Sequence, residues 1–150
     1  MVDPRSEPRR FRLLIDVDVV LDVLTRRNPF FADSTAVLAA CETGRCAGAV
    51  AAHTLTTLWY LLTKYHGRAY AREKTAELLR IVEVAAVDQE VIHAALVLDF
   101  SDFEDAVQSQ GAAAAGADYI VTRNLADFSR GPVSATTPAE VLTLLPPEGL

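Results

Sequence analysis

The stretch from Phe11 to Asp22, which reads F-R-L-L-I-D-V-D-V-V-L-D, constrains the fold of this chain more than any other. Its apolar run, Leu13-Leu14-Ile15, is short and contains a β-branched residue, which predicts a strand buried on both faces. Asp16 follows this strand directly. Open α/β sheets bind their ligands at the edge where parallel strands end. The sequence therefore predicts that the first strand, over about 11–16, delivers a carboxylate to the active edge of a parallel sheet.

Strands and helices alternate along the rest of the chain. Apolar runs predict strands over 46–52, 81–87 and 119–122, with a short fifth strand around Val133. Helical spacing and capping residues predict helices over about 18–26, 31–43, 54–65, 68–80, 89–98, 101–116 and 137–145. Asp88 and Thr137 are expected to cap two of them. This alternation predicts an α/β fold with a mostly parallel sheet of four to five strands, covered by helices on both faces.

Composition limits the class of protein. The chain has 150 residues, of which 51% are hydrophobic, so we expect one domain over 11–145 between a flexible N-terminal tail over 1–10 and a C-terminal tail over 146–150. No apolar run reaches the roughly 20 residues of a membrane helix, and the N-terminus lacks a signal-peptide core, so we expect a cytoplasmic protein without a membrane partner. The net charge of −6 argues against binding nucleic acid by charge alone. Cys41 and Cys46 fit no metal-binding or redox spacing and are expected to be buried thiols.

Acidic residues fall at matched places in this pattern. Asp16 ends the first strand, Asp102 and Asp105 lie in the first turn of a helix, and Asp127 follows the fourth strand. Because parallel strands point the same way, these positions gather on one edge of the sheet. Clustered carboxylates repel one another unless a cation binds, and their hard oxygens suit Mg²⁺ or Mn²⁺. Such ions can activate water and hold the phosphoryl oxygens of a substrate.

Several of these acids also fit purely structural roles. Ser101 and Glu104 match an S-x-x-E capping box, so Glu104 is predicted to be a helix cap. Asp102, in the same turn, suits the helix dipole. Asp105 lies beside an apolar stripe and is predicted to be half-exposed, which favours a role in the site.

Three other acids have structural alternatives as well. Asp18 can be the N-cap of the first helix, and Asp127 can belong to a cap that begins at Asn124. Asp22, one turn beyond Asp18, is expected on a solvated helix face. His53 lies near the same edge, and a structural role is expected for it.

The chain resembles the PIN-domain nucleases, including the VapC-type toxins of toxin–antitoxin pairs, over about 11–145. The resemblance is carried by L-I-D-V-D-V-V-L-D-V-L, A-A-H-T-L-T-T-L-W-Y-L-L, D-F-S-D-F-E-D-A-V-Q and D-Y-I-V-T-R-N-L-A-D-F. It implies a three-layer α/β/α fold and a metal-dependent endoribonuclease. Asp16, Asp105 and Asp127 match the family's acids, which implies that these three are catalytic and bind Mg²⁺ or Mn²⁺. It further implies an RNA substrate and a cognate antitoxin protein.

Two departures from the family's pattern bear on the metal site. Asp18 stands where the family usually has Asn, which keeps oxygen donors but adds charge. Thr57 stands where many members have Glu, and its hydroxyl can hydrogen-bond water but cannot neutralise an ion. Either Asp18 or Asp102 replaces the lost charge, or the site binds the metal weakly.

The segment after the fourth strand carries polar residues that we expect around these acids. Thr122 and Asn124 are predicted to orient Asp127 or a phosphate. Arg123 is predicted either to bind phosphate in RNA or to form a salt bridge at the strand end.

Three further interpretations stay open at this point. Asp16-Val17-Asp18 resembles the D-x-D motif of haloacid-dehalogenase-like phosphatases, although Gly-Thr does not follow it. The substitution at Thr57 also allows a PIN fold that binds RNA or protein without cleaving RNA. Apolar residues on more than one face of the helix over 54–65 predict a homodimer contact or an antitoxin groove.

Overall fold

Five parallel strands form the centre of the molecule. The computed structural model describes residues 11–147, so the tail predicted over 1–10 and the last residues of the C-terminal tail lie outside the described residues. The strands are β1 (Arg12–Ile15), β2 (Ala47–Ala51), β3 (Glu83–Ala85), β4 (Tyr119–Val121) and β5 (Ala135–Thr136). They form one sheet in the order β3-β2-β1-β4-β5, and every neighbouring pair is parallel.

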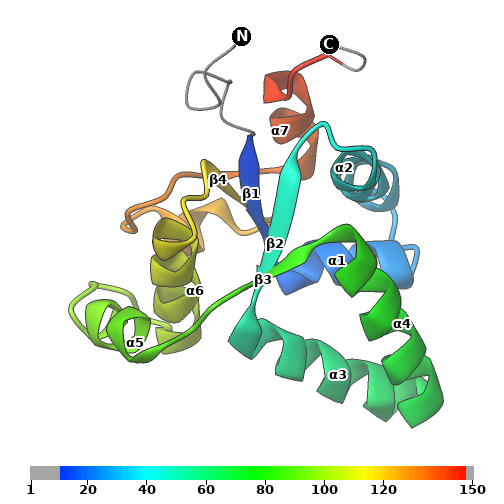
Figure 1. Cartoon of the computed structure of the whole chain (residues 1–150), viewed down its shortest axis with the longest axis horizontal. Helices are drawn as coiled ribbons and strands as arrows, with labels where there is room; N and C mark the ends of the chain where they lie inside the picture. The colour runs from blue at the N-terminus through cyan, green and yellow to red at the C-terminus, as the bar shows by residue number, and fades with distance from the viewer. Residues whose placement is uncertain (1–10, 148–150) are drawn as a thin grey trace, which may run out of the picture.

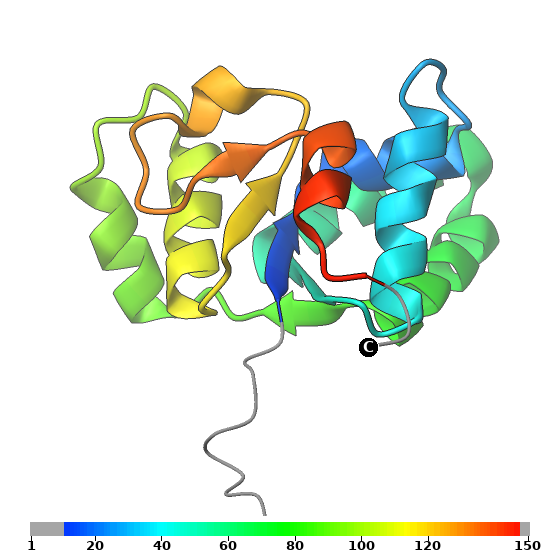
Figure 2. The ribbon, with the colours of Figure 1, turned by 90° about the horizontal axis from the view of Figure 1, so that it is seen from above.

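Seven α-helices within the described residues cover the two faces of this sheet (Figures 1 and 2). One face carries α1 (Val17–Leu24), α2 (Phe31–Glu42), α3 (Ala52–His66), α4 (Arg68–Ile81) and α7 (Pro138–Leu144). The other carries α5 (Gln89–Leu96) and α6 (Phe103–Ala114). The predicted three-layer α/β/α fold is confirmed. None of the helices within 11–147 is long and apolar enough to cross a membrane.

The pleat of the strands explains the two cores. Successive side chains of a strand point to opposite faces of the sheet. Leu13 and Ile15 pack against α1, α2, α3 and α4, whereas Leu14 and Ile120 pack on the other face with Ala112 of α6. Because β1 is buried on both faces, it lies at the centre of the sheet, as its uninterrupted apolar run predicts.

The strand order distinguishes one position along the carboxyl edge of the sheet, the position between β1 and β4. The chain builds β1, β2 and β3 outward in one direction and then crosses to β4 and β5 on the other side of β1. The carboxyl ends of β1 and β4 therefore form the topological switch point, at which α/β sheets bind ligands.

Two local expectations are wrong, and each has a physical reason. The fifth strand is Ala135–Thr136, because Ile120 and Val121 pair with these residues, while Val133 is buried in the core just before the strand. Helix α1 begins one residue earlier than predicted, because Asp16 rather than Asp18 is its N-cap. The caps predicted at Asp88 and Thr137 are confirmed.

Candidate active site

Asp16 is held by both central strands at the switch point. Its backbone N–H donates to the carbonyl of Val121. Its Oδ1 accepts from Val17 N at 2.8 Å, and its Oδ2 accepts from Thr122 Oγ1 at 2.9 Å. The Thr122 side chain is fully buried, so its hydroxyl is a fixed donor. The carboxylate is thus oriented by a helix start and by a side chain from β4's carboxyl end.

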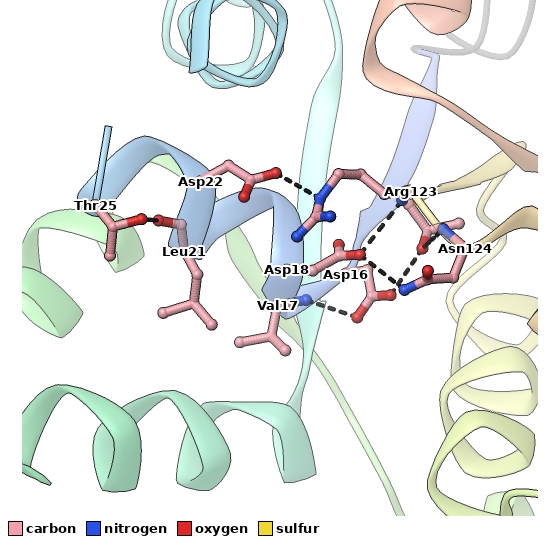
Figure 3. A network of polar contacts seen from close by, with 9 residues as sticks. Asp16, Val17, Asp18, Leu21, Asp22, Thr25, Arg123 and Asn124 are labelled. Atoms are coloured by element: carbon pink, nitrogen blue, oxygen red, sulfur yellow. Dashed lines mark hydrogen bonds and ion pairs between the residues drawn. The ribbon is translucent and has the colours of Figure 1, made fainter. Parts of the chain in front are cut away.

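Asp18 lies beside Asp16 and is bound by the segment after β4 (Figure 3). Its Oδ2 accepts from Arg123 N at 3.4 Å and from Asn124 Nδ2 at 3.2 Å. Asn124 is positioned in turn by its own N–H, which donates to Thr122 Oγ1 at 3.0 Å. Burial, and then the charge of Asp16, raise the pKa of Asp18 to about 6. Thr122 and Asn124 therefore orient Asp16 and Asp18, whereas the sequence predicted that they orient Asp127 or a phosphate.

Asp22 is the residue whose role the sequence analysis missed. It was expected on a solvated face, but it is fully buried, and its Oδ2 lies 2.7 Å from Arg123 Nε (Figure 3). The two side chains therefore form an ion pair. Burial raises the pKa of Asp22, and Arg123 opposes that rise. The signal was present, because Asp22 lies three residues after Val19 and so on the buried stripe of α1.

Arg123 forms the salt bridge that is one of its two predicted roles, and phosphate binding by Arg123 stays a prediction. Its guanidinium pairs with Asp22 and lies 4.3 Å from the ring centre of Phe30, a cation–π distance. Its backbone N–H faces Asp18. Arg123 thus connects the segment after β4 to α1 twice, through its side chain to Asp22 and through its backbone N–H to Asp18.

The start of α6 brings another acid to the edge. Asp102 is the N-cap, and its Oδ1 accepts from Asp105 N at 3.0 Å. The capping box predicted for Ser101 and Glu104 is wrong, since Ser101 lies one residue before the cap. Burial first, and then the negative charges of Asp102, Asp127, Asp16 and Glu104, together raise the pKa of Asp105 to about 7. Asp105 thus lies within electrostatic reach of both other predicted catalytic acids.

Asp127 lies in the short 3₁₀ helix Leu125–Phe128 and is exposed. Its backbone N–H donates to the carbonyl of Asn124 at 3.1 Å, while no side chain caps this helix. Asp127 lines a cavity of about 380 Å³ together with Ser101, Ser129 and Arg130. The edge beside the acids is therefore hollowed and polar.

Helix α3 contributes two residues near the same edge. Thr57 is half-buried and lies one turn before Leu61, which lines a cavity of about 420 Å³ together with Asp18. His53 Nε2 lies 3.2 Å from the carbonyl of Glu104 and donates to it, because a carbonyl can only accept. His53 therefore ties the start of α3 to the start of α6, which is the structural role expected for it.

The donor set fits a hard, partly hydrated divalent cation. Among residues 11–147, no group of three or more His, Cys, Asp or Glu side chains is arranged to hold a metal ion. Mg²⁺ usually keeps several waters and takes only one or two carboxylates from the protein. Asp18 Oδ1 is buried and accepts no hydrogen bond from a described residue, and Asp105 is surrounded by negative charge. At both positions the described residues leave negative charge only partly compensated, and a bound cation would compensate it.

A comparison with protein families gives one match. The model of the family described as "PIN domain" matches residues 12–126, which contain the carboxyl ends of β1 and β4 and the start of α6. No curated protein matches the chain significantly.

Solved structures share the fold at low sequence identity. VapBC2 from Rickettsia felis, bound to a promoter DNA fragment, is 15% identical with a TM-score of 0.67, over 85% of this chain and 98% of that one. A toxin–antitoxin complex from Klebsiella pneumoniae is 18% identical with a TM-score of 0.64, over 84% and 97%. VapC20 of Mycobacterium tuberculosis, a Sarcin–Ricin loop cleaving toxin, is 16% identical with a TM-score of 0.58, over 72% and 86%.

Proposed function

Because the chain belongs to the PIN-domain family, whose model matches residues 12–126, we propose that it is a metal-dependent endoribonuclease and the toxin of a toxin–antitoxin pair. The observation that carries the proposal is that the charges of Asp16 and Asp127 raise the pKa of Asp105. These acids come from the end of β1, the segment after β4 and α6, respectively. Acids that repel one another at a ligand-binding edge are typical of a functional site. The solved toxin structures with the same fold support the toxin assignment.

Asp16, Asp105 and Asp127 are proposed to hold Mg²⁺ or Mn²⁺, one or two of them directly and the rest through water molecules bound to the ion. A bound ion of this kind supplies charge neutralisation at phosphoryl oxygens and activation of water. The residues of this chain supply the rest. Thr122 holds the Asp16 carboxylate in one orientation, and Asp127 faces the polar cavity in which a phosphodiester can lie.

The test is cleavage of a panel of structured RNAs. We expect the purified chain to cut single-stranded or loop segments with Mg²⁺ or Mn²⁺ and to stop in excess EDTA. Asp105→Asn removes one charge at the same side-chain volume and is expected to abolish cleavage. Glu42→Gln is the matched control, because Glu42 is exposed at the end of α2, near the start of β2 and so at the opposite edge of the sheet. Cleavage that persists in EDTA, with an inactive Asp105 variant, contradicts the proposal.

The same experiment separates the two alternatives. The PIN-domain match leaves the phosphatase interpretation of Asp16 and Asp18 without support, and hydrolysis of a chromogenic phosphate ester in place of RNA would restore it. A PIN fold that binds without cutting predicts no Mn²⁺ binding and no cleavage, with RNA or partner binding intact.

An antitoxin is the proposed protein partner. Two of the solved structures that share this fold are described as VapBC or toxin–antitoxin assemblies. Leu21 of α1 and Leu61 and Leu62 of α3 line the cavity of about 420 Å³ together with Asp18, which offers a largely apolar groove next to the site. We expect a small protein encoded beside this chain's gene to co-purify with it and to block RNA cleavage. Co-expression with one affinity tag tests this.

The exposed side of α3 concerns the predicted homodimer. Leu58 and Leu62 are buried, Trp59 is partly buried, and Tyr60 and Tyr65 are 62% and 68% exposed. Light scattering at high protein concentration tests whether this face associates. The dimer and the cytoplasmic location stay predictions.

A further inference from the structure

The carboxylates of Asp16 and Asp18 together present four oxygens, and the protein satisfies three of them. Asp16 Oδ1 accepts from Val17 N and Oδ2 from the Thr122 hydroxyl. Asp18 Oδ2 accepts from Arg123 N and from Asn124 Nδ2. Asp18 Oδ1 is buried and accepts no hydrogen bond from any described residue. The pair therefore has one buried oxygen without a well-formed hydrogen bond to any described residue.

An arrangement of this kind is unfavourable unless something binds to that oxygen. A buried polar atom without a partner costs free energy, and the neighbouring Asp16 charge adds repulsion. Arg123 and Asn124 do not offset this cost at Oδ1, because both donate to Oδ2 of Asp18. A divalent cation shared with Asp16 removes both costs together.

The structure also decides between the two acids that can replace the charge missing at Thr57. Asp102 is exposed, and its Oδ1 already caps α6 by accepting from Asp105 N at 3.0 Å. Asp18 is half-buried and shares a cavity wall with Leu61, one turn beyond Thr57 on α3. The unsatisfied oxygen thus belongs to Asp18, whereas Asp102 already serves as the cap of α6.

We propose that Asp18 is itself a ligand of the divalent cation, through Oδ1, and forms with Asp16 a carboxylate pair on the β1 side of the site. This inference rests on the proposed function, since it concerns the same metal. It adds a fourth carboxylate to Asp16, Asp105 and Asp127, which offsets the neutral hydroxyl at Thr57. Thr122 and Asn124 are then positioning residues, because each holds one member of the pair by the oxygen that faces it.

Asp18→Asn is the variant that isolates this role. An asparagine keeps one oxygen, which can still accept from Arg123 N and from Asn124, so the segment after β4 stays attached. Its other atom becomes an amide nitrogen, which does not bind a hard cation. Glu42→Gln carries the same change of charge at the opposite edge of the sheet and serves as the control.

The readout is Mn²⁺ binding, measured by calorimetric titration and by the Mn²⁺-dependent rise in melting temperature, without RNA. We expect Asp18→Asn to weaken Mn²⁺ binding more than about tenfold, because even groups that only support a metal ligand change affinity about 10–100-fold. Glu42→Gln should bind as the wild type does. Circular dichroism of both variants without metal establishes that they are folded.

The outcomes separate this inference from the proposed function. Equal Mn²⁺ affinity of a folded Asp18→Asn variant and the wild type overturns the role of Asp18 and leaves the proposed nuclease intact. A wild type that binds no Mn²⁺ overturns both. Loss of binding in Glu42→Gln to the same degree as in Asp18→Asn also overturns the inference, because the effect is then one of net charge.

Discussion

Replacing Arg123 by methionine removes the positive partner of a fully buried carboxylate. Asp22 is 0% exposed. The Arg123 guanidinium, 2.7 Å away, is the main charge that compensates it, and Arg27 contributes less. Methionine keeps much of the side-chain length and can still pack on Phe30, so the variant removes charge more than volume.

The magnitude follows from the burial. Removing one partner of a buried ion pair costs about 3–5 kcal/mol, because the other charge is left uncompensated. Asp22 can escape part of this cost by binding a proton, so we expect about 3 kcal/mol at pH 7.5. For a domain of this size that corresponds to a melting temperature lower by about 6–12 °C.

The loss should depend on pH with a definite sign. Burial holds the pKa of folded Asp22 above its ordinary value of 3.8, and removal of Arg123 raises it further. A raised carboxyl pKa costs stability above the folded pKa and costs nothing below the unfolded one. The deficit of Arg123→Met should therefore shrink as the pH falls from 7.5 toward 4.

The assay is urea and thermal unfolding of four proteins in EDTA, at pH 7.5 and pH 4.5. These are the wild type, Arg123→Met, Asp22→Leu and the double variant, which form a double-mutant cycle. We expect the double variant to recover most of the stability lost in Arg123→Met, because an apolar pair of similar volume can replace a buried ion pair. A deficit below about 1 kcal/mol, or one that is equal at both pH values, would refute the reasoning.

Three further predictions use the same melting assay. Asp105→Asn should raise the metal-free melting temperature by a few degrees at pH 8 and by nothing at pH 4, since ionised Asp105, with a pKa near 7, costs on the order of 1 kcal/mol after solvent screening. A lower melting temperature at pH 8 contradicts this. Gly48→Ala should destabilise by about 1–3 kcal/mol, because its Cβ would lie 2.6 Å from Cys41 Sγ, whereas Gly111→Ala in α6 should stabilise by up to about 1 kcal/mol. Equal changes in melting temperature for the two glycine variants would contradict the difference in space around Gly48 and Gly111. Asp102→Ala should cost about 1 kcal/mol of helix capping, while Asp102→Asn should keep the cap.

Local patterns in the chain are enough to predict most of the fold. The apolar run before Asp16 predicts the central strand, and Thr137-Pro138 predicts the start of α7. Each pattern depends on residues that are close in sequence, so no tertiary information is needed. The convergence of acids at one edge was also predictable, because the direction of parallel strands alone brings strand ends together.

Local patterns fail where two neighbouring residues have similar chemistry. Ser101 and Asp102 are both good N-caps, and only the path of the chain into α6 decides that Asp102 accepts from Asp105 N. Val133 and Ala135 are both compatible with a strand, and only the register against Ile120 selects Ala135. In each case the choice depends on backbone geometry that a capping or strand propensity does not contain.

The sequence by itself determined the α/β/α architecture and the family, and it predicted which acids lie at the candidate site. Only the tertiary structure decided how those acids are held: Thr122 on Asp16, Asn124 on Asp18, and Arg123 on a buried Asp22. These partners lie far apart in the chain and meet because β4 is inserted beside β1. Burial and pairing are properties of that arrangement, and for this reason a carboxylate that looks solvated on its own helix can become the buried half of an ion pair.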